Sequence, residues 1–218
     1  MTYSPLRYPG GKNRIAPFIA EICIENDFHG CYVEPYSGGA SVALFLLFEN
    51  VVEKIIINDK DRSIYAFWYC VLNKTKAFCK KIYDTEISLE EWEKQKKIQT
   101  NKNKADLFDL GFSTFFLNRT NRSGIITGGP IGGIEQNGNY KIDCRFNKDD
   151  LVYRIKRIAS RKKDIKLYHK DALNLINIVE VRLGNTNNFL YYFDPPYFDK
   201  GSTLYMNYYH KKDHKDVS

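Results

Sequence analysis

Short apolar runs alternate with amphipathic stretches in the first third of the chain. Cys31 to Val33 and Ile55 to Ile57 are apolar runs of strand length, and a helical pattern follows each of them. The first of these helices is predicted over Ala40 to Phe48. After the second run, apolar residues recur at helical spacing from Ile64 to Leu72, which gives one buried face. Strand, helix, strand and helix in this order predict parallel β-α-β units.

The same alternation returns near the C-terminus. Asn147 is a predicted N-cap because acidic residues follow it in the first helical turn. A strand is expected from Ile165 to His169 and a helix from Leu173 to Leu183. Phe189 to Phe193 is a continuous apolar run, as expected of a strand covered on both faces.

The middle of the chain has a different texture. Glu90 to Lys104 is highly charged with few apolar positions, and an apolar helix is predicted from Leu107 to Leu117. Glycines then crowd the chain up to Gly138, which favours loops and turns. We therefore predict an α/β fold with a mainly parallel sheet, interrupted by a helical and loop insertion that carries a binding surface.

Composition narrows the partners. Lys and Arg outnumber Asp and Glu by 33 to 26, and the net charge of +7 suits a polyanion, although many basic proteins bind none. No apolar run approaches the roughly 20 residues needed to span a bilayer, so we expect no membrane and a cytoplasmic location. The five cysteines form no C-x-x-C pair, and we expect neither a disulfide nor a metal site. His210 and His214 have a metal spacing, but no third ligand lies nearby.

The tetrapeptide Asp194-Pro195-Pro196-Tyr197 directly follows the last apolar run. Polar residues at a strand terminus of an open α/β sheet lie where such sheets bind ligands. Two prolines stiffen the backbone and remove N–H donors, which leaves the Asp194 carboxylate and the Pro195 carbonyl as acceptors. Two acceptors can hold an exocyclic amino group, and Tyr197 can stack on a base. The alternative is a proline-stiffened turn with an incidental carboxylate.

A glycine-rich turn follows the first strand. Glu34 to Ala40 lies between strand and helix, where glycines such as Gly38 let the backbone approach a ligand. Asp59 ends the second strand about 20 residues later, a spacing typical of an acid that binds ribose hydroxyls. The pair predicts a nucleoside-containing cofactor, while an ordinary glycine turn explains the motif equally well when it stands alone. Near the N-terminus, Tyr8 to Lys12 contains a Gly-Gly turn next to a lysine that can bind a carboxylate or phosphate. Taken alone, this motif is better explained as a surface turn, and its spacing is not that of a P-loop.

These motifs occur in an order that resembles the Dam-type (D12 class) DNA adenine methyltransferases over nearly the whole chain. The resemblance implies a Rossmann-like methyltransferase fold, S-adenosylmethionine as cofactor, double-stranded DNA as partner, and methylation of adenine N6. It also implies a bacterial or phage-type, nucleoid-associated protein. The motifs that carry it are Tyr8 to Lys12, Glu34 to Ser41, Asn58-Asp59, Phe115 to Thr120, Asp171 after Tyr168-His169-Lys170, and Asp194 to Tyr197.

The resemblance and the motifs together assign the candidate site residues. The expected catalytic residues are Asp194, Pro195, Pro196 and Tyr197. The expected cofactor-binding residues are Tyr8, Lys12, Glu34, Tyr36, Gly38, Asp59, Asp171 and Asp194. The expected DNA contacts are Asn118, Arg119, Asn121 and Arg122, because Arg and Asn can read G and A edges. Weaker, phosphate-type candidates are Lys141, Arg145 and Lys148, and Tyr205, Tyr208 and Tyr209 are candidates for the rim of the base pocket.

The expected division of the chain follows from this assignment. Residues 1–74 form the cofactor-binding part of the catalytic domain, residues 75–150 the target-recognition insertion, and residues 151–218 the catalytic part. Members of the resembled family continue with more strands, so Phe189 to Phe193 is expected to be an incomplete sheet edge. We expect a further C-terminal segment or a partner chain to complete it.

Two alternatives stay open. One is a truncated, weakly active or inactive remnant that still binds DNA or the cofactor. The other is the same chemistry on RNA or on a protein amide. The recognition sequence and the choice between restriction-modification, phage and housekeeping roles are left open.

Overall fold

The structure is a computed structural model that describes residues 2–7, 12–183 and 188–195, without the side chains of residues 182 and 183. The chain forms two compact units. The sheet unit comprises residues 1–3, 11–61 and 162–218, and the helical unit comprises residues 4–10 and 62–161. Some candidate residues lie outside the described part of the chain: Tyr8, Pro196, Tyr197, Tyr205, Tyr208, Tyr209, His210 and His214.

The sheet unit contains four parallel strands in the described residues, which confirms the predicted α/β fold. The sheet order is β3-β2-β1-β4, so β1 lies between β2 and β4. Tyr32 on β1 pairs with Ile55 on β2 and with Leu190 on β4. The bounds are Cys31–Glu34 for β1, Lys54–Asn58 for β2, Ile165–Tyr168 for β3 and Phe189–Tyr191 for β4.

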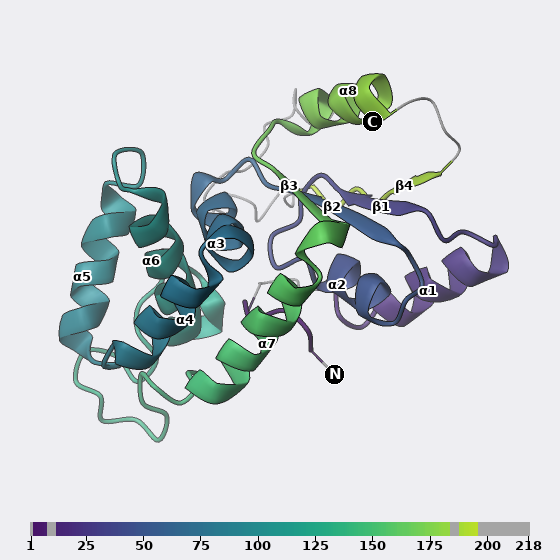
Figure 1. The fold of residues 1–218 in the computed structure, drawn as a ribbon. Coiled ribbons are helices and arrows are strands. Elements are labelled where there is room, and N and C mark those ends of the chain that lie inside the picture. Colours follow the sequence, from purple (N-terminus) through teal and green to yellow (C-terminus); the bar gives the residue numbers. More distant parts are fainter. Residues whose placement is uncertain (1, 8–11, 184–187, 196–218) are drawn as a thin grey trace. The chain divides into compact units, whose positions relative to one another are not determined.

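Helices cover both faces of this sheet (Figure 1). Helix α8 (Ala172–Leu183) lies on one face, where Leu175 and Val179 pack with Val33 of β1 and Ile56 of β2. Helices α1 (Ala16–Glu25) and α2 (Ser41–Phe48) lie on the other face. Because Val33 and Ile56 are completely buried, the central strands are anchored from both sides. The loops that follow the strands are therefore held at one edge by a rigid scaffold.

Strand β4 differs from the two central strands. It ends the sheet order, and its three residues are only half-buried in the described structure. The two-sided burial expected for this apolar run is therefore not seen among the described residues, because a strand paired on one side receives less cover. Pairing continues past the strand, since the Tyr192 N–H donates to the Val33 carbonyl at 2.9 Å.

The helical unit is organised around α6 (Leu107–Thr120), which lies between α3 (Arg62–Asn73) and α5 (Leu89–Thr100) (Figure 1). Most of α6 is buried on all sides. Gly111 lets α3 approach closely, because a Cβ at this position would lie 2.5 Å from the Ala66 carbonyl oxygen. The predicted helix Leu107 to Leu117 is thus confirmed and runs three residues further.

Aromatic side chains fill the core of the helical unit. Phe67 of α3 stacks on Phe115 of α6, with ring centroids 6.0 Å apart. Phe78 comes from α4 (Thr75–Asp84) and meets Phe115 edge to face at 5.7 Å. Helix α7 (Lys148–Ser160) packs against α3 and α4. Its predicted N-cap is confirmed, since the Asn147 side chain accepts from the Asp150 N–H.

The charged stretch Glu90 to Lys104 is largely helical. Helix α5 begins after Ser88, whose hydroxyl accepts from the Glu91 N–H at 3.2 Å. This Ser-x-x-Glu sequence is a capping signal for the start of a helix, but the stretch was not predicted as a helix because it is highly charged and has few apolar positions. The glycine-rich stretch that ends at Gly138 forms turns, as predicted, and the isolated bridge between Asn121 and Pro130 closes one of them.

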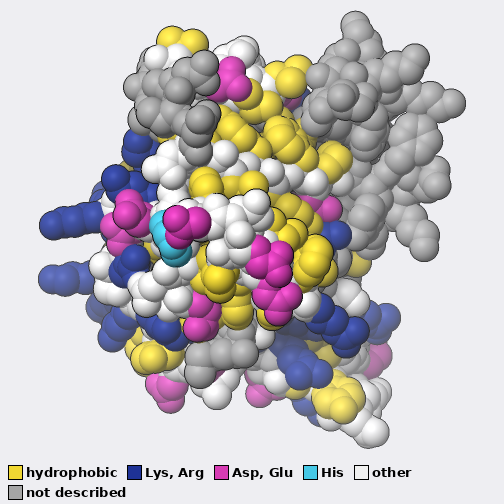
Figure 2. Space-filling view, turned by 90° about the vertical axis from the view of Figure 1, so that its right-hand side faces the viewer, with side chains coloured by type: hydrophobic (Ala, Val, Ile, Leu, Met, Phe, Trp, Pro, Cys, Tyr) yellow, Lys and Arg dark blue, Asp and Glu magenta, His cyan; other side chains and the backbone are white. Residues whose placement is uncertain are grey.

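Packing groups α3 and α7 with the helical unit. The division into cofactor-binding, target-recognition and catalytic parts at residues 74 and 150 stays a prediction. Among the described residues, no helix is both long and apolar enough to cross a membrane. Figure 2 shows a face on which hydrophobic side chains lie among acidic and basic ones.

Candidate active site

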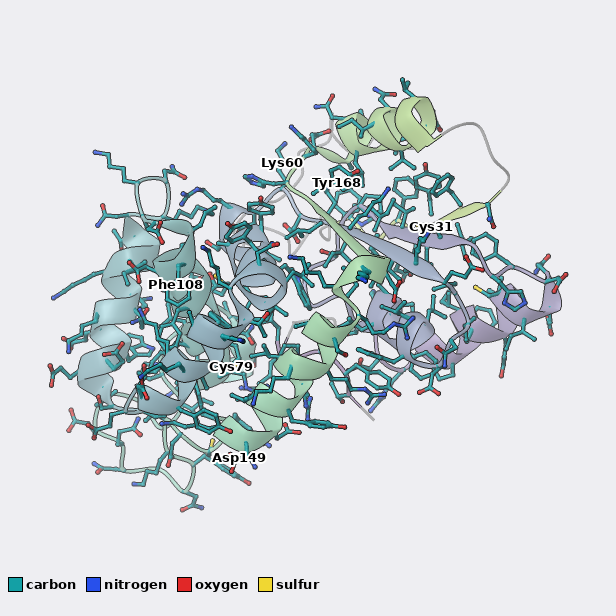
Figure 3. The ribbon with its side chains drawn as sticks, in the orientation of Figure 1. Cys31, Lys60, Cys79, Phe108, Asp149 and Tyr168 are labelled. Carbon is teal, nitrogen blue, oxygen red and sulfur yellow. The ribbon has the colours of Figure 1, made fainter. Side chains whose placement is uncertain are left out.

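The candidate site lies at the edge of the sheet unit where the four parallel strands of the described residues have their C-terminal ends. Glu34 ends β1, Asp59 follows β2, Asp171 follows β3 and Asp194 follows β4. Ligands of open α/β sheets bind at this edge. Figure 3 shows Lys60 and Tyr168 close together there, at the ends of β2 and β3. The topology therefore gathers the acidic residues that the sequence spreads over 160 positions.

The turn after β1 brings the backbone close to this edge. Gly38 has a φ of 44°, a left-handed conformation that glycine adopts without strain. The Ser37 N–H donates to the Asn58 carbonyl at 2.9 Å, which ties the turn to the end of β2. The Ser37 hydroxyl is buried and has no hydrogen-bond partner in the described structure. Because a buried hydroxyl without a partner is costly, this position is suited to a polar atom of a ligand.

Asp59 is oriented by backbone donors. Its two carboxylate oxygens accept from the Gly38 N–H at 3.0 Å and from the Asp61 N–H at 2.8 Å. The carboxylate is thus fixed against the glycine turn. The binding of ribose hydroxyls suggested by the spacing between Gly38 and Asp59 stays a prediction. Each carboxylate oxygen has two acceptor positions, so the same group can accept further hydrogen bonds from a ligand.

Asn58 holds two of the loops together and was not among the predicted site residues. Its Nδ2 donates to the Pro35 carbonyl at 2.8 Å and to the Lys170 carbonyl at 3.0 Å. Its Oδ1 accepts from the Lys170 N–H at 2.9 Å. Asn58 is completely buried and links the loop after β1 with the loop after β3. Its place beside Asp59 at a strand end is the signal that could have revealed this role.

Asp171 lies on the loop between β3 and α8. Its Oδ1 accepts from the Leu173 N–H at 3.2 Å, which caps the start of α8. Its Oδ2 lies 3.1 Å from the Lys60 ammonium, and the two side chains are 31% and 60% exposed. This ion pair is accessible to water, so it contributes little to stability. Lys60 is a second site neighbour that the sequence did not single out.

Glu34 is the buried acid of the site. It is 4% exposed, and its Oε1 accepts from the Ala43 N–H at 3.1 Å and from the Tyr32 hydroxyl at 3.2 Å. Burial raises the pKa of Glu34 to about 8, and the negative charge of Asp194 adds to the rise. In the described structure, Glu34 therefore anchors the first turn of α2 to β1 and does not present a free carboxylate at the surface.

Asp194 forms a salt bridge with Lys12. The Lys12 Nζ lies 3.2 Å from the Asp194 Oδ1, and the two side chains are 27% and 32% exposed. Tyr192 lies two residues before Asp194, and its ring stacks on that of Tyr32 with centroids 6.3 Å apart. The contact between Tyr192 and β1 fixes the start of the loop that carries Asp194. Two motifs 182 residues apart, the lysine of the N-terminal Gly-Gly turn and the Asp-Pro-Pro acid, thus meet in space.

Comparison with known proteins identifies the family. The chain matches the D12 class N6 adenine-specific DNA methyltransferases over residues 8–217. It belongs to this family. It is also similar to the Type II methyltransferase M.MjaIII of Methanocaldococcus jannaschii, with 27% identity over 97% of this chain and 74% of the relative. The chain is therefore an adenine-specific DNA methyltransferase, and the resemblance seen in its motifs is confirmed.

Two predicted DNA contacts of this methyltransferase are buried. Asn118 is 1% exposed; its Oδ1 accepts from the Arg7 N–H at 2.7 Å, and its Nδ2 donates to the Arg7 carbonyl at 2.6 Å and the Gly124 carbonyl at 2.9 Å. Asn121 is completely buried; its Nδ2 donates to two backbone carbonyls, and its Oδ1 accepts from the Trp92 indole at 2.6 Å. The structure corrects the prediction for both residues, because their amides bind the protein itself.

The other predicted DNA contacts lie nearer the surface of the helical unit. Arg122 is exposed, whereas Arg119 is half-buried and donates to the Arg145 carbonyl through Nε at 2.8 Å and through Nη2. Of the weaker candidates, Lys148 donates to the Tyr83 and Thr85 carbonyls, which ties α7 to the end of α4. The exposed arginine therefore remains a candidate for base contacts, and Lys148 has a structural role.

Proposed function

We propose that the edge of the sheet unit binds S-adenosylmethionine and that Asp194 holds the target adenine during methylation of N6. The observation that carries the proposal is the position of Asp194, at the end of the strand next to β1 and in a salt bridge with Lys12. A nucleoside-containing cofactor fits this edge for two reasons. The buried Ser37 hydroxyl lacks a partner in the described structure, and the Asp59 carboxylate is already oriented by backbone donors.

The cofactor-binding residues divide by chemistry. Asp59 and Asp171 are carboxylates that can accept from ribose hydroxyls or from an exocyclic amine, and the Gly38 turn gives the backbone close access. Lys12 can bind a carboxylate group of the cofactor. Tyr36 and Tyr8 are proposed from the motifs alone. When bound, S-adenosylmethionine supplies an electrophilic methyl group on a sulfonium.

Asp194 is proposed to act on the target amine. Its carboxylate and the Pro195 carbonyl accept hydrogen bonds from the two N–H bonds of N6, which leaves the nitrogen lone pair directed away from the loop. As the methyl group left the sulfonium and the new N–C bond formed, N6 would become positively charged. The Asp194 carboxylate would stabilise this charge and accept the proton that leaves N6. Tyr197, on the same motif, is proposed to stack on the base.

The salt bridge between Lys12 and Asp194 suits this role. In the absence of substrate, the Lys12 ammonium offsets the negative charge of the Asp194 carboxylate. Asp194 lies near enough to the buried Glu34 to raise its pKa. An incoming amine replaces one N–H donor with another, so the carboxylate does not have to be desolvated from bulk water. Lys12 therefore balances the charge of Asp194 before binding, whereas the amine that enters is neutral until the N–C bond forms.

The target adenine is proposed to leave the duplex. An amine inside a base pair cannot reach a strand-end loop, so the nucleotide must be flipped out at a cost of a few kcal/mol. Phosphate contacts from basic side chains would anchor the duplex during this step. The Type II relative leads us to propose a role in restriction-modification, on DNA in the cytoplasm.

Incubation with methyl-labelled S-adenosylmethionine and mixed-sequence duplex DNA, followed by nucleoside analysis, tests the proposal. We expect labelled N6-methyladenine from the wild-type protein and a loss of product of at least about 100-fold in Asp194→Ala. The matched control is Glu53→Ala, an exposed acid that precedes β2 at the opposite end of the strands. Full product from Asp194→Ala would contradict the assigned role, and cofactor binding without any product in the wild type would favour an inactive remnant.

A further inference from the structure

Four arginines gather in the helical unit from four separate segments. Arg7 lies in the N-terminal segment, Arg119 in the last turn of α6, Arg145 in the loop before α7, and Arg154 on α7 itself. Each of the other three arginines lies close enough to Arg119 to lower its pKa, and Arg145 lowers the pKa of Arg7 in the same way. We call these four residues the arginine cluster.

The protein holds the cluster in place largely through backbone carbonyls. Arg119 donates to the Arg145 carbonyl, and Arg7 Nη1 donates to the Asn121 carbonyl at 3.4 Å. Arg154 Nη1 donates to the Ser4 carbonyl at 3.2 Å. Carbonyl oxygens orient a guanidinium group without neutralising its charge. The cluster is therefore ordered but still strongly positive.

One carboxylate offsets this charge among the described residues. Asp150 accepts from Arg154 at both oxygens, at 3.1 Å from Nε and 2.8 Å from Nη2. Four guanidinium groups thus share a single described salt bridge. Burial and the neighbouring arginines lower the pKa of Arg119 to about 10 and also lower the pKa of Arg7. Holding these like charges close together, with Arg119 half-buried, costs free energy, which a bound anion would offset.

We propose that the arginine cluster is a binding site for phosphate groups of the DNA backbone, separate from the residues that read bases. The planar guanidinium group binds phosphate through two parallel N–H bonds, which favours an oxyanion as the ligand. DNA is the polyanion that a methyltransferase of this family must bind, so this inference rests on the proposed function. The cluster supplies affinity that is independent of sequence.

Arg145→Gln is the sharpest single test of the cluster. The Arg145 side chain is exposed, and the contact that orients Arg119 uses the Arg145 backbone carbonyl, which the substitution keeps. The matched control is Lys156→Gln on α7, because Lys156 is exposed and lies two residues after Arg154, and residues two apart do not share a helix face. A double variant, Arg145→Gln with Arg154→Gln, removes two of the four charges.

The measurement is the dissociation constant for a labelled duplex at several salt concentrations, by fluorescence anisotropy. For Arg145→Gln we expect roughly three- to tenfold weaker binding at low salt. We also expect the slope of log K against log salt to shrink by about 0.9, equally for duplexes with and without the methylated site. In the double variant, the slope of log K against log salt should decrease by about twice as much as in Arg145→Gln. Lys156→Gln should bind like the wild type.

The outcomes separate this proposal from the proposed function. Unchanged affinity and slope in the double variant would overturn the phosphate site, as would a loss confined to one duplex sequence at constant slope. Binding is measured without methyl transfer, so a wild-type protein that bound DNA but made no N6-methyladenine would contradict only the catalytic proposal. Inorganic phosphate at constant ionic strength provides a further check. Wild-type affinity for the duplex should fall in its presence, and the double variant should be less sensitive.

Discussion

Two polar segments next to glycines behave in opposite ways in this methyltransferase. The segment around Gly38 and Asp59, in the sheet unit, lies at the end of parallel strands, where backbone N–H groups orient the carboxylate. The segment with Asn118 and Asn121, in the helical unit, lies at the C-terminal end of a helix that is buried on all sides, and its amides turn inward to bind the backbone. Residue type alone suggests ligand contacts for both. The secondary-structure element to which each segment is attached decides whether its polar side chains lie at a ligand-binding end of the sheet or bind the protein itself.

The largest expected effect concerns the stability of the helical unit. Asn118→Ala removes three hydrogen bonds and leaves the Arg7 N–H, the Arg7 carbonyl and the Gly124 carbonyl without their partner. We expect the free energy of unfolding to fall by about 2–4 kcal/mol, measured by urea denaturation. Asn103→Ala, an exposed residue of the same unit, should change it by less than about 0.5 kcal/mol. Unchanged stability with altered choice of DNA sequence would restore Asn118 as a base contact.

The buried acid of the sheet unit should make stability depend on pH. Because burial raises the pKa of Glu34 from 4.5 to about 8, the folded protein keeps a proton that the unfolded chain releases. Stability from this group is therefore complete below pH 4.5 and is lost as pH rises toward 8. Each unit of pKa corresponds to about 1.4 kcal/mol, so the loss amounts to a few kcal/mol. Urea denaturation of Glu34→Gln between pH 5 and 8 should give a flatter profile than the wild type, and parallel profiles would refute the assignment.

A smaller effect is expected on cofactor binding. Asp59→Asn replaces the charged acceptor that the Gly38 turn orients, and we expect the dissociation constant of S-adenosylmethionine to rise about tenfold, or about 1.4 kcal/mol. Isothermal titration calorimetry measures this directly. The control is Asp27→Asn, whose side chain is 99% exposed and precedes β1 at the opposite edge of the sheet. Equal affinities for both variants would remove Asp59 from the cofactor site.

Local sequence patterns predicted the strands and helices that have either one apolar face or an apolar run along their whole length. The runs at Ile55 to Ile57 and Ile165 to Tyr168 are strands, and the apolar stretch from Leu107 is a helix. Helix α5 was not predicted because its stability depends on the Ser88 cap and on packing against α6, neither of which produces an apolar stripe. Helices α1 and α4 were also not predicted, although Phe78, Cys79 and Ile82 give α4 an apolar face.

The positions of site residues that directly follow a predicted strand could be predicted from the sequence. Contacts between residues from distant segments could not. Gly38, Asp59 and Asp171 lie at strand ends, so their common edge follows from the order of elements. The salt bridge between Lys12 and Asp194 joins residues from opposite ends of the chain, and its geometry is not encoded in either motif alone. The inward orientation of Asn118 depends on Arg7, 111 positions earlier, which no local pattern reveals.

We propose that Asp194 acts on the reacting amine at the strand ends, where the glycine turn and Asp59 also lie. The most direct measurement is the single-turnover rate of methyl transfer by Asp194→Asn, with S-adenosylmethionine and duplex DNA both saturating. We predict a rate at least about 100-fold below that of the wild type, because the uncharged amide stabilises the developing positive charge poorly. A rate within a few-fold of the wild type would contradict the claim.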